Sequence, residues 1–429
     1  MRLRILLSAA LSLSQASPGF AQADPILASR AEYRDAMQAY KEKDTTSFLQ
    51  HAQRAAELRP DHGGVVYALA SAYALMGDMQ KAVETLGRFA SMGYYANLAA
   101  DSDLTRLSGA AGYDRVRQAV EANRRPVVKS EVAFTLPERD LLTEGIAYDP
   151  AMRRFFVGSV HHRKILQVDR SGRASEFVPA GQDSLWAPLG MRVDSARRVL
   201  WVAAATVPQM IGYDSTESGR SGLFRYDLAT QRLTGRFLTP ADSGGHLLGD
   251  LTIAKNGDVY TSDSRAPIVW RLPAGGDSLE IFVETPLLLS AQGLALTPDG
   301  RTLYQADYSR GILKIDVATR TAAVIPCRTG VVAIGIDGLY LVGNRLIGIQ
   351  NGMEPHRVVG LTLAPRGDSL VALDVLERRH PSHVEPTLGV VVGQYLYYIA
   401  NSQWERFGDT GEVARPDELV PPAVLRLRL

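Results

Sequence analysis

The stretch that decides the fold is QGLALTPDGRTLY, residues 292–304. It begins with a glycine after a polar residue, continues as an apolar run, turns at Pro298-Asp299-Gly300, and resumes as a second apolar run. Pro, Asp and Gly favour tight turns, and two such runs around a turn are typical of an antiparallel hairpin. The stretch is therefore predicted to form two strands of an all-β unit.

Five further segments begin in the same way, with a glycine beside the first residue of an apolar strand. The six starts are Glu144–Tyr148, Leu189–Val193, Gly249–Ile253, Gln292–Leu296, Asp337–Leu341 and Leu388–Val392. They are spaced 43 to 60 residues apart, close to the length of a four-stranded propeller blade. Six inner strands predict a six-bladed β-propeller. The alternative, a β-sandwich, does not explain six starts of one kind.

The ends of this region predict how the ring closes. The last blade stops at Leu429 after its third strand, and the strand at residues 132–136 precedes the first blade without a blade of its own. We expect residues 132–136 to pair near residues 423–427, because closure between distant strands removes a free sheet edge.

The chain before the propeller is expected to be helical. A shift of 34 residues superimposes Tyr33 on Tyr67, Ala36 on Ala70, Asp44 on Asp78, Arg54 on Arg88 and Ala56 on Ala90. This period resembles a tetratricopeptide repeat. Helices are predicted over residues 29–43, 45–58, 64–76 and 79–92, with a further helical hairpin within 94–122. The predicted domains are a helical domain over 24–124 and a propeller over 127–429. The repeats would bind a protein partner in a groove or serve as a spacer, and so short an array favours the spacer.

The first residues are predicted to be a secretory signal peptide. Arg2 and Arg4 precede a short apolar run, and Ala21-Gln22-Ala23 provides a small-residue cleavage pattern. We expect removal of residues 1–23 and export to the periplasm or the medium, with no membrane span. The single cysteine, Cys327, excludes an intrachain disulfide and a cysteine-based zinc site.

The overall charge bears on the class of partner. Lys and Arg number 47 and Asp and Glu number 46, which gives a formal net charge of +1. A nucleic-acid-binding domain shows a basic excess or a basic stripe. The balanced charge therefore argues against a nucleic-acid partner.

Polar residues stand at the starts of several inner strands, where a propeller brings them to one mouth of its channel. Glu144, Gln292 and Asp337 carry oxygen donors at these starts. Converging oxygens suit Ca²⁺, Mg²⁺ or Mn²⁺, although such groups can also cap a water-filled tunnel. Six of the eight histidines fall in loops of the same face: His161, His162, His246, His356, His380 and His383.

Residues 130–429 resemble the gluconolactonase, regucalcin and senescence-marker propellers, which have paraoxonases and strictosidine-synthase-like proteins as relatives. The resemblance rests on Glu144-Gly145, Gly249-Asp250, Gln292-Gly293 and Asp337-Gly338. It implies a central divalent metal held by a Glu, two Asn and an Asp. Glu144 and Asp337 match this set, Gln292 stands where one Asn is expected, and Gly249 stands at the other. The resemblance favours Ca²⁺, with Mg²⁺, Mn²⁺ or Zn²⁺ as options.

Two functions from different classes follow. The first is a metal-dependent hydrolase of lactones or related esters, in which the metal polarises the carbonyl and a base activates water. Asp250 is the first candidate for the base and His246 the second. The alternative is a non-catalytic module that binds a peptide, a glycan or a small ligand, since propellers host both roles.

Two further patterns are open at the level of sequence. Asp307 follows the second strand of its blade and is either a partner of the metal ligands or a turn-forming residue. The spacing of His380, His383 and Glu385 allows a second metal site, but a solvated loop is the favoured interpretation.

Overall fold

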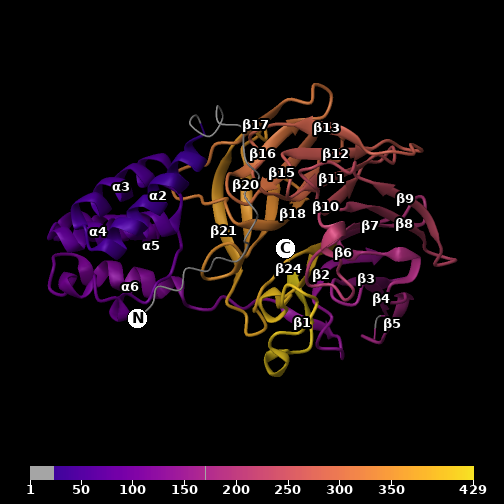
Figure 1. The fold of residues 1–429 in the computed structure, drawn as a ribbon, viewed down its shortest axis with the longest axis horizontal. Helices are drawn as coiled ribbons and strands as arrows, with labels where there is room; N and C mark the ends of the chain where they lie inside the picture. Colours follow the sequence, from indigo (N-terminus) through magenta and orange to yellow (C-terminus); the bar gives the residue numbers. More distant parts are fainter. Residues whose placement is uncertain (1–23, 170) are drawn as a thin grey trace. The chain divides into compact units, whose positions relative to one another are not determined.

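The computed structural model describes residues 24–169 and 171–429, and the predicted signal peptide lies outside this part of the chain. The chain divides into two compact units. One comprises the chain up to residue 126 with the short segments 329–332 and 353–355, and the other comprises residues 127–328, 333–352 and 356–429. Figure 1 shows that the first is helical and the second is built of sheets. None of the helices described is long and apolar enough to cross a membrane.

The part of the helical unit that the structure describes, from residue 24 onward, contains five α-helices. They are α2 (Pro25–Glu42), α3 (Thr45–Leu58), α4 (Gly63–Met76), α5 (Met79–Ser91) and α6 (Tyr113–Asn123). The 34-residue shift places equivalent residues at equivalent positions: Asp44 caps the start of α3 and Asp78 that of α5, each through its side chain. Such caps satisfy backbone N–H groups that the first helical turn leaves free. The two hairpins are thus alike, and the tetratricopeptide assignment stays a prediction.

Two details of the helical prediction are wrong. The first helix begins at Pro25, four residues earlier than expected, because Asp24 accepts hydrogen bonds from Ile26 and Leu27 and caps it there. Residues 94–122 do not form a helical hairpin. Their first part holds only two short 3₁₀ turns, Leu98–Ala100 and Thr105–Leu107, before α6.

The second unit consists of six four-stranded antiparallel sheets, which confirms the predicted six-bladed propeller. Five sheets are formed by consecutive strands: β2–β5 (Thr143–Asp149, Arg154–Ser159, Lys164–Val168, Ala174–Val178), β6–β9 (Ala187–Asp194, Val199–Ala205, Ser221–Asp227, Leu233–Leu238), β10–β13 (Leu248–Ile253, Val259–Asp263, Ile268–Leu272, Glu280–Glu284), β14–β17 (Ala291–Leu296, Thr302–Asp307, Gly311–Asp316, Ala322–Val324) and β18–β21 (Ile336–Val342, Arg345–Gln350, Arg357–Leu363, Leu370–Arg378).

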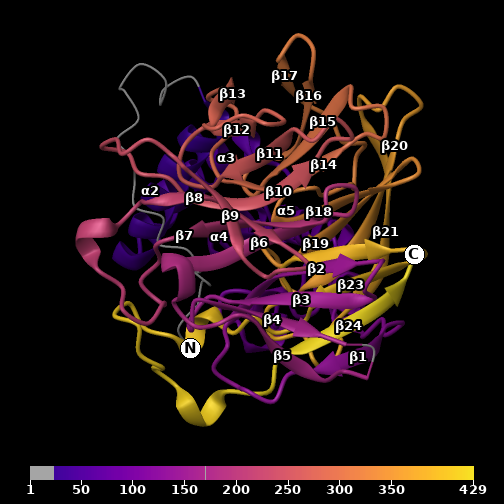
Figure 2. The same cartoon turned by 90° about the vertical axis from the view of Figure 1, so that its right-hand side faces the viewer.

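The sixth sheet joins the two ends of the propeller. Its strands are β22 (Gly389–Val392), β23 (Tyr395–Ile399), β24 (Ala423–Arg428) and β1 (Glu131–Thr135), in that order. Strand β1 pairs antiparallel with β24, with Glu131 opposite Arg426 and Thr135 opposite Ala423. The two strands lie side by side in both views (Figure 2). The predicted closure is confirmed, and it covers the edge that β24 would otherwise expose.

The repeated glycines have a structural reason. In β2, β6, β10, β14 and β18, the register shifts near the strand start, and the bulge contains the polar-residue–glycine pair or its equivalent. A Cβ on Gly145 would lie 1.8 Å from the carbonyl oxygen of Leu189, and one on Gly293 would lie 2.4 Å from that of Asp337. In β2, β6, β14 and β18 the bulge glycine lets the inner strand lie directly against the next, and the residue before it occupies the same position. In β10 Gly249 holds the first of these two positions and Asp250 the second.

Candidate functional site

Carboxylates gather at the end of the ring where the inner strands begin. Glu144 and Asp337 occupy bulge positions of β2 and β18, and Glu385 lies in the connection from β21 to β22. The charges of Asp337 and Glu385 both raise the pKa of Glu144, so the three groups act on one another at the same end of the ring. Their ligand atoms do not all lie within 4.8 Å of one another. None of the three forms an ion pair with another residue in the described chain. The structure thus places acidic groups together that are far apart in sequence.

Glu144 is held by the insertion between β23 and β24. Its Oε2 accepts hydrogen bonds from the indole Nε1 of Trp404 at 2.8 Å and from Oγ of Ser402 at 3.0 Å. The residue is only 8% exposed. Burial and the charge of Asp337 raise its pKa well above the ordinary value, against the lowering effect of the Trp404 hydrogen bond.

Asp337 has a neutral amide as its partner. Nδ2 of Asn351 donates to Oδ2 of Asp337 at 2.8 Å, and Oδ1 of the same amide accepts from the hydroxyl of Tyr308 at 3.0 Å. Burial raises the pKa of Asp337 to about 7; the Asn351 hydrogen bond lowers it and the charge of Asp250 raises it further. Burial therefore favours the neutral form of Asp337 at pH values where an exposed aspartate is ionised.

Glu385 and Gln292 complete the set of oxygen donors. The backbone N–H of Trp404 donates to Oε2 of Glu385 at 3.0 Å, and burial raises the pKa of this carboxyl to about 7. Gln292 occupies the bulge position of β14, beside β18. Its Nε2 donates to Oγ of Ser290 at 3.1 Å, so its amide oxygen is the atom not used in that bond.

The first candidate base, Asp250, lies in the bulge of β10 and is 1% exposed. Its Oδ2 lies 3.1 Å from a guanidinium nitrogen of Arg192, whereas its Oδ1 is buried without a hydrogen-bond partner among the described residues. Burial raises the pKa of Asp250, and the charge of Arg192 opposes that rise. The negative charge of Asp250 also raises the pKa of Asp337. Asp250 therefore belongs to the same group of carboxylates.

The second candidate, His246, is engaged elsewhere. Its Nδ1 lies 2.6 Å from Asp263 and its Nε2 lies 3.0 Å from Asp242, so both ring nitrogens face carboxylates. Burial disfavours the charged ring, but the hydrogen bonds and charges of these two carboxylates raise the pKa of His246 overall. A protonated imidazole between two acceptors has no lone pair for a proton, which makes His246 a weaker candidate than Asp250.

Asp307 and the segment with His380 and His383, whose roles the sequence left open, are not part of the group of central carboxylates. Asp307 accepts backbone hydrogen bonds from Leu289, Ser290, Ser309 and Arg310, as a turn-forming residue does. In the segment with the two histidines, Nε2 of His383 lies 2.8 Å from the hydroxyl of Tyr398, and Nδ1 of His380 accepts from the backbone of Ser382. These three residues do not share a close cluster of ligand atoms in the described chain, since Glu385 faces the central carboxylates.

Sequence reasoning missed four residues of the site: Tyr308, Asn351, Ser402 and Trp404. Each lies just after the second strand of its blade, where the chain emerges at the same end of the ring as the start of the inner strand. That position is the signal that could have found them. A search confined to the starts of the inner strands could not, because these residues reach the site from the neighbouring loop.

The Asn351 contact gives a prediction about pH. Asn351→Ala removes the hydrogen bond that lowers the pKa of Asp337, so that carboxyl should stay protonated to a higher pH. The lowest pH at which Ca²⁺ raises the melting temperature should therefore move upward. Tyr308→Phe is the matched control, because it removes a hydrogen bond to Asn351 and leaves the Asn351–Asp337 contact. Equal shifts in both variants would contradict the assignment.

Two surface grooves lie at the other end of the ring. One of about 330 Å³ is lined by the turns at Arg197, Gly257 and Pro273, and one of about 690 Å³ by the turns near Asn256 and Asp299. These turns join inner strands to second strands or third strands to outer ones. They are therefore remote from the bulges that carry Glu144 and Asp337.

No protein-family model matches the sequence, and no curated protein matches it. Solved structures similar to this chain include a gluconolactonase from Xanthomonas campestris, with 16% identity, 71% of this chain and 97% of that chain covered, and a TM-score of 0.46. They also include the calcium-binding protein regucalcin from Agrobacterium tumefaciens, with 15% identity, 69% of this chain and 93% of that chain covered, and a TM-score of 0.46. A third is a PQQ-bound aldose sugar dehydrogenase from Streptomyces coelicolor, with 13% identity, 71% of this chain and 98% of that chain covered, and a TM-score of 0.47. The assignment of six blades rests on the strand pairing itself.

Proposed function

We propose that this protein is a metal-dependent hydrolase of lactones or related esters, with its site at the group formed by Glu144, Gln292, Asp337 and Glu385. The observation that carries the proposal is a group of buried carboxylates without an ion-pair partner in the described chain, in which the charge of Asp337 raises the pKa of both Glu144 and Glu385. The pKa of Asp337 is itself raised by burial and by the charge of Asp250. Asp250 is already balanced by Arg192. The remaining negative charge is stabilised when a cation binds among these groups.

The donor types suit a hard divalent ion, and binding one would draw the carboxylates closer together, because their ligand atoms do not all lie within 4.8 Å of one another. Carboxylate and amide oxygens are the ligands that Ca²⁺ takes, and Glu144, Asp337 and Gln292 supply them from three bulges. Glu385 adds a carboxylate beside them. Gly249 contributes no side-chain ligand at its own bulge. When bound, such an ion polarises a substrate carbonyl and stabilises the negative charge that develops on its oxygen.

The residues of the chain supply the rest of the chemistry. We assign Asp250 as the group that takes a proton from the attacking water, because burial raises its pKa against the lowering effects of Arg192 and of the backbone N–H groups of Leu251 and Leu294. Arg192 fixes the orientation of that carboxylate through Oδ2. Trp404 donates from its indole Nε1 to Glu144 and from its backbone N–H to Glu385, so the insertion after β23 holds both acids in place.

The experiment that tests the proposal measures hydrolysis of a panel of lactones and aryl esters by the purified protein. We expect activity with Ca²⁺, loss of that activity with a chelator, and its recovery when Ca²⁺ is restored. Arg192→Lys is an informative variant, since it keeps the charge beside Asp250 and loses the planar contact. Its activity should fall about tenfold or more without a change in the response of the melting temperature to Ca²⁺.

A different outcome would favour the binding module. If Ca²⁺ raises the melting temperature and no substrate of the panel is hydrolysed, the carboxylates hold an ion without catalysis. If neither Ca²⁺ nor chelator affects stability or activity, the proposal is overturned at the metal itself. Export of the mature chain and a protein partner for the helical unit remain proposals of their own.

A further inference from the structure

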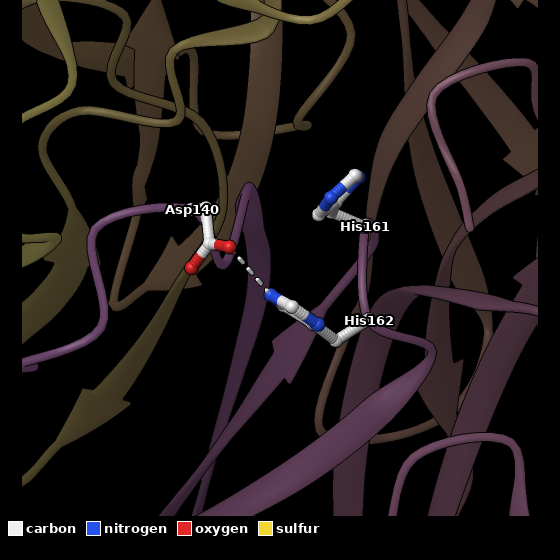
Figure 3. Close-up of side chains that lie close together, drawn as sticks. All are labelled: Asp140, His161 and His162. Carbon is white, nitrogen blue, oxygen red and sulfur yellow. Dashed lines mark ion pairs between the residues drawn. The ribbon is translucent and has the colours of Figure 1, made fainter. Parts of the chain in front are cut away.

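Asp140, His161 and His162 form a second cluster that the central carboxylates do not use (Figure 3). Asp140 lies between β1 and β2, and the two histidines lie in the turn between β3 and β4. One possible ligand atom from each lies within 4.8 Å of the other two. Among the residues described, this is the one group of three His, Cys, Asp or Glu side chains that meets this limit.

His161 presents a defined nitrogen. Its Nδ1 lies 2.8 Å from the carbonyl oxygen of Gln209, and a carbonyl oxygen only accepts, so Nδ1 carries the hydrogen and Nε2 has the lone pair. Metal-binding imidazoles show the same arrangement, with the other ring N–H donated to a carbonyl or carboxylate. The ring is 4% exposed and packs against Phe407 with 4.9 Å between centroids. Its position is thus fixed before any ligand arrives.

His162 and Asp140 provide the other two donors. Nε2 of His162 lies 3.0 Å from Oδ2 of Asp140, as Figure 3 shows. This nitrogen is buried and has no hydrogen bond among the described residues, since the carboxylate is not aligned for one. Two ligand atoms on a tetrahedral zinc ion lie about 3.3–3.5 Å apart, because each bond is about 2.0–2.1 Å. The pair therefore needs to open by only a few tenths of an ångström to admit an ion.

We propose that Asp140, His161 and His162 bind a zinc ion, with one coordination position left for water. Two imidazoles and one carboxylate are a donor set that Zn²⁺ accepts, whereas Ca²⁺ and Mg²⁺ take oxygen ligands. The ion fastens the segment that leads into β2 to the β3–β4 turn. Through the Gln209 carbonyl it also stabilises the insertion between β7 and β8.

The test measures binding of ZnCl₂ to the full-length mature protein by titration calorimetry, with CoCl₂ as a spectroscopic probe. We expect one tight zinc site and a rise of several degrees in the melting temperature. Bound Co²⁺ should give a visible absorption spectrum typical of a four- or five-coordinate ion, and added Zn²⁺ should abolish that spectrum. Asp140→Asn and His162→Gln should each weaken zinc binding at least tenfold. Both residues are partly exposed, so the metal-free variants should melt within about 2 °C of the parent protein.

Two controls separate this site from others. His51→Gln removes a histidine that faces a single carboxylate, Glu32, at 2.7 Å, and should leave zinc affinity unchanged. The double variant Glu144→Gln, Asp337→Asn disables the central carboxylates and should also keep it. Zinc binding that survives Asp140→Asn and His162→Gln, or that disappears with the central double variant, would overturn the proposal, as would failure of the parent protein to bind Zn²⁺. None of these results depends on hydrolase activity.

Discussion

Phe134→Ala should destabilise the propeller by about 3 kcal/mol, at the lower end of the range for loss of a buried aromatic side chain. Phe134 is the buried residue of β1 and belongs to the apolar cluster that includes Leu136, Val157 and Ile399. Strand β1 closes the ring by completing the sheet of β22, β23 and β24. Loss of the Phe134 side chain therefore weakens the contact between the first and last strands of the propeller. The melting temperature should fall by about 6 °C or more.

The matched control lies in the same strand. Val132 lies two residues before Phe134 and is 49% exposed. Its backbone pairs with that of Leu425 in β24. Val132→Ala should change stability by less than about 0.5 kcal/mol, as is usual for an exposed site. Thermal unfolding followed by circular dichroism distinguishes the two variants. Equal effects would show that the inward face of β1 does not hold the closure.

The blades could be predicted because each one repeats the same local pattern. A glycine beside a polar residue, an apolar strand and a tight turn are all set within about a dozen residues, as at Gln292 to Tyr304. The closure by β1 could also be predicted, since a leftover strand at one end matched a missing strand at the other. The expected hairpin within 94–122 was wrong because its Ala-rich composition favours helices while Gly109 and Gly112 adopt positive φ and interrupt them.

The site was only half accessible to sequence reasoning. Glu144 and Asp337 share the bulge position, so the repeat pattern alone brings them together. Trp404 and Asn351 follow the second strands of their blades, but no shared residue type marks that position, and their contacts depend on the path of one insertion and one loop. The pKa values follow from burial among neighbours that are distant in the chain, which no local pattern encodes. The cluster at Asp140 was missed for the same reason, since it combines a lone aspartate with two adjacent histidines from another turn.

Asp337→Asn should have two effects of opposite sign. In the metal-free protein the pKa of Asp337 is raised to about 7, so the folded state holds a proton that the unfolded state has released. The contribution of this group to stability is therefore lost as pH rises from about 4 through 7. Asparagine carries no charge to bury and keeps an oxygen for Asn351. With chelator at pH 8, the variant should melt several degrees above the parent, and at pH 5 the two should nearly coincide.

The same variant should lose the response to metal. A divalent ion at one hundred times its dissociation constant stabilises the parent by about 2.7 kcal/mol, a rise of roughly 5 °C. Asp337→Asn should remove most of that rise and lower hydrolysis of any lactone or ester substrate more than 100-fold. Asp277→Asn, at an exposed turn, is the control and should change neither quantity. The proposal requires the charge of Asp337 to destabilise the metal-free protein at high pH. A variant that is less stable than the parent at every pH, with or without metal, would contradict the proposal, because Asp337 would then stabilise the fold by itself.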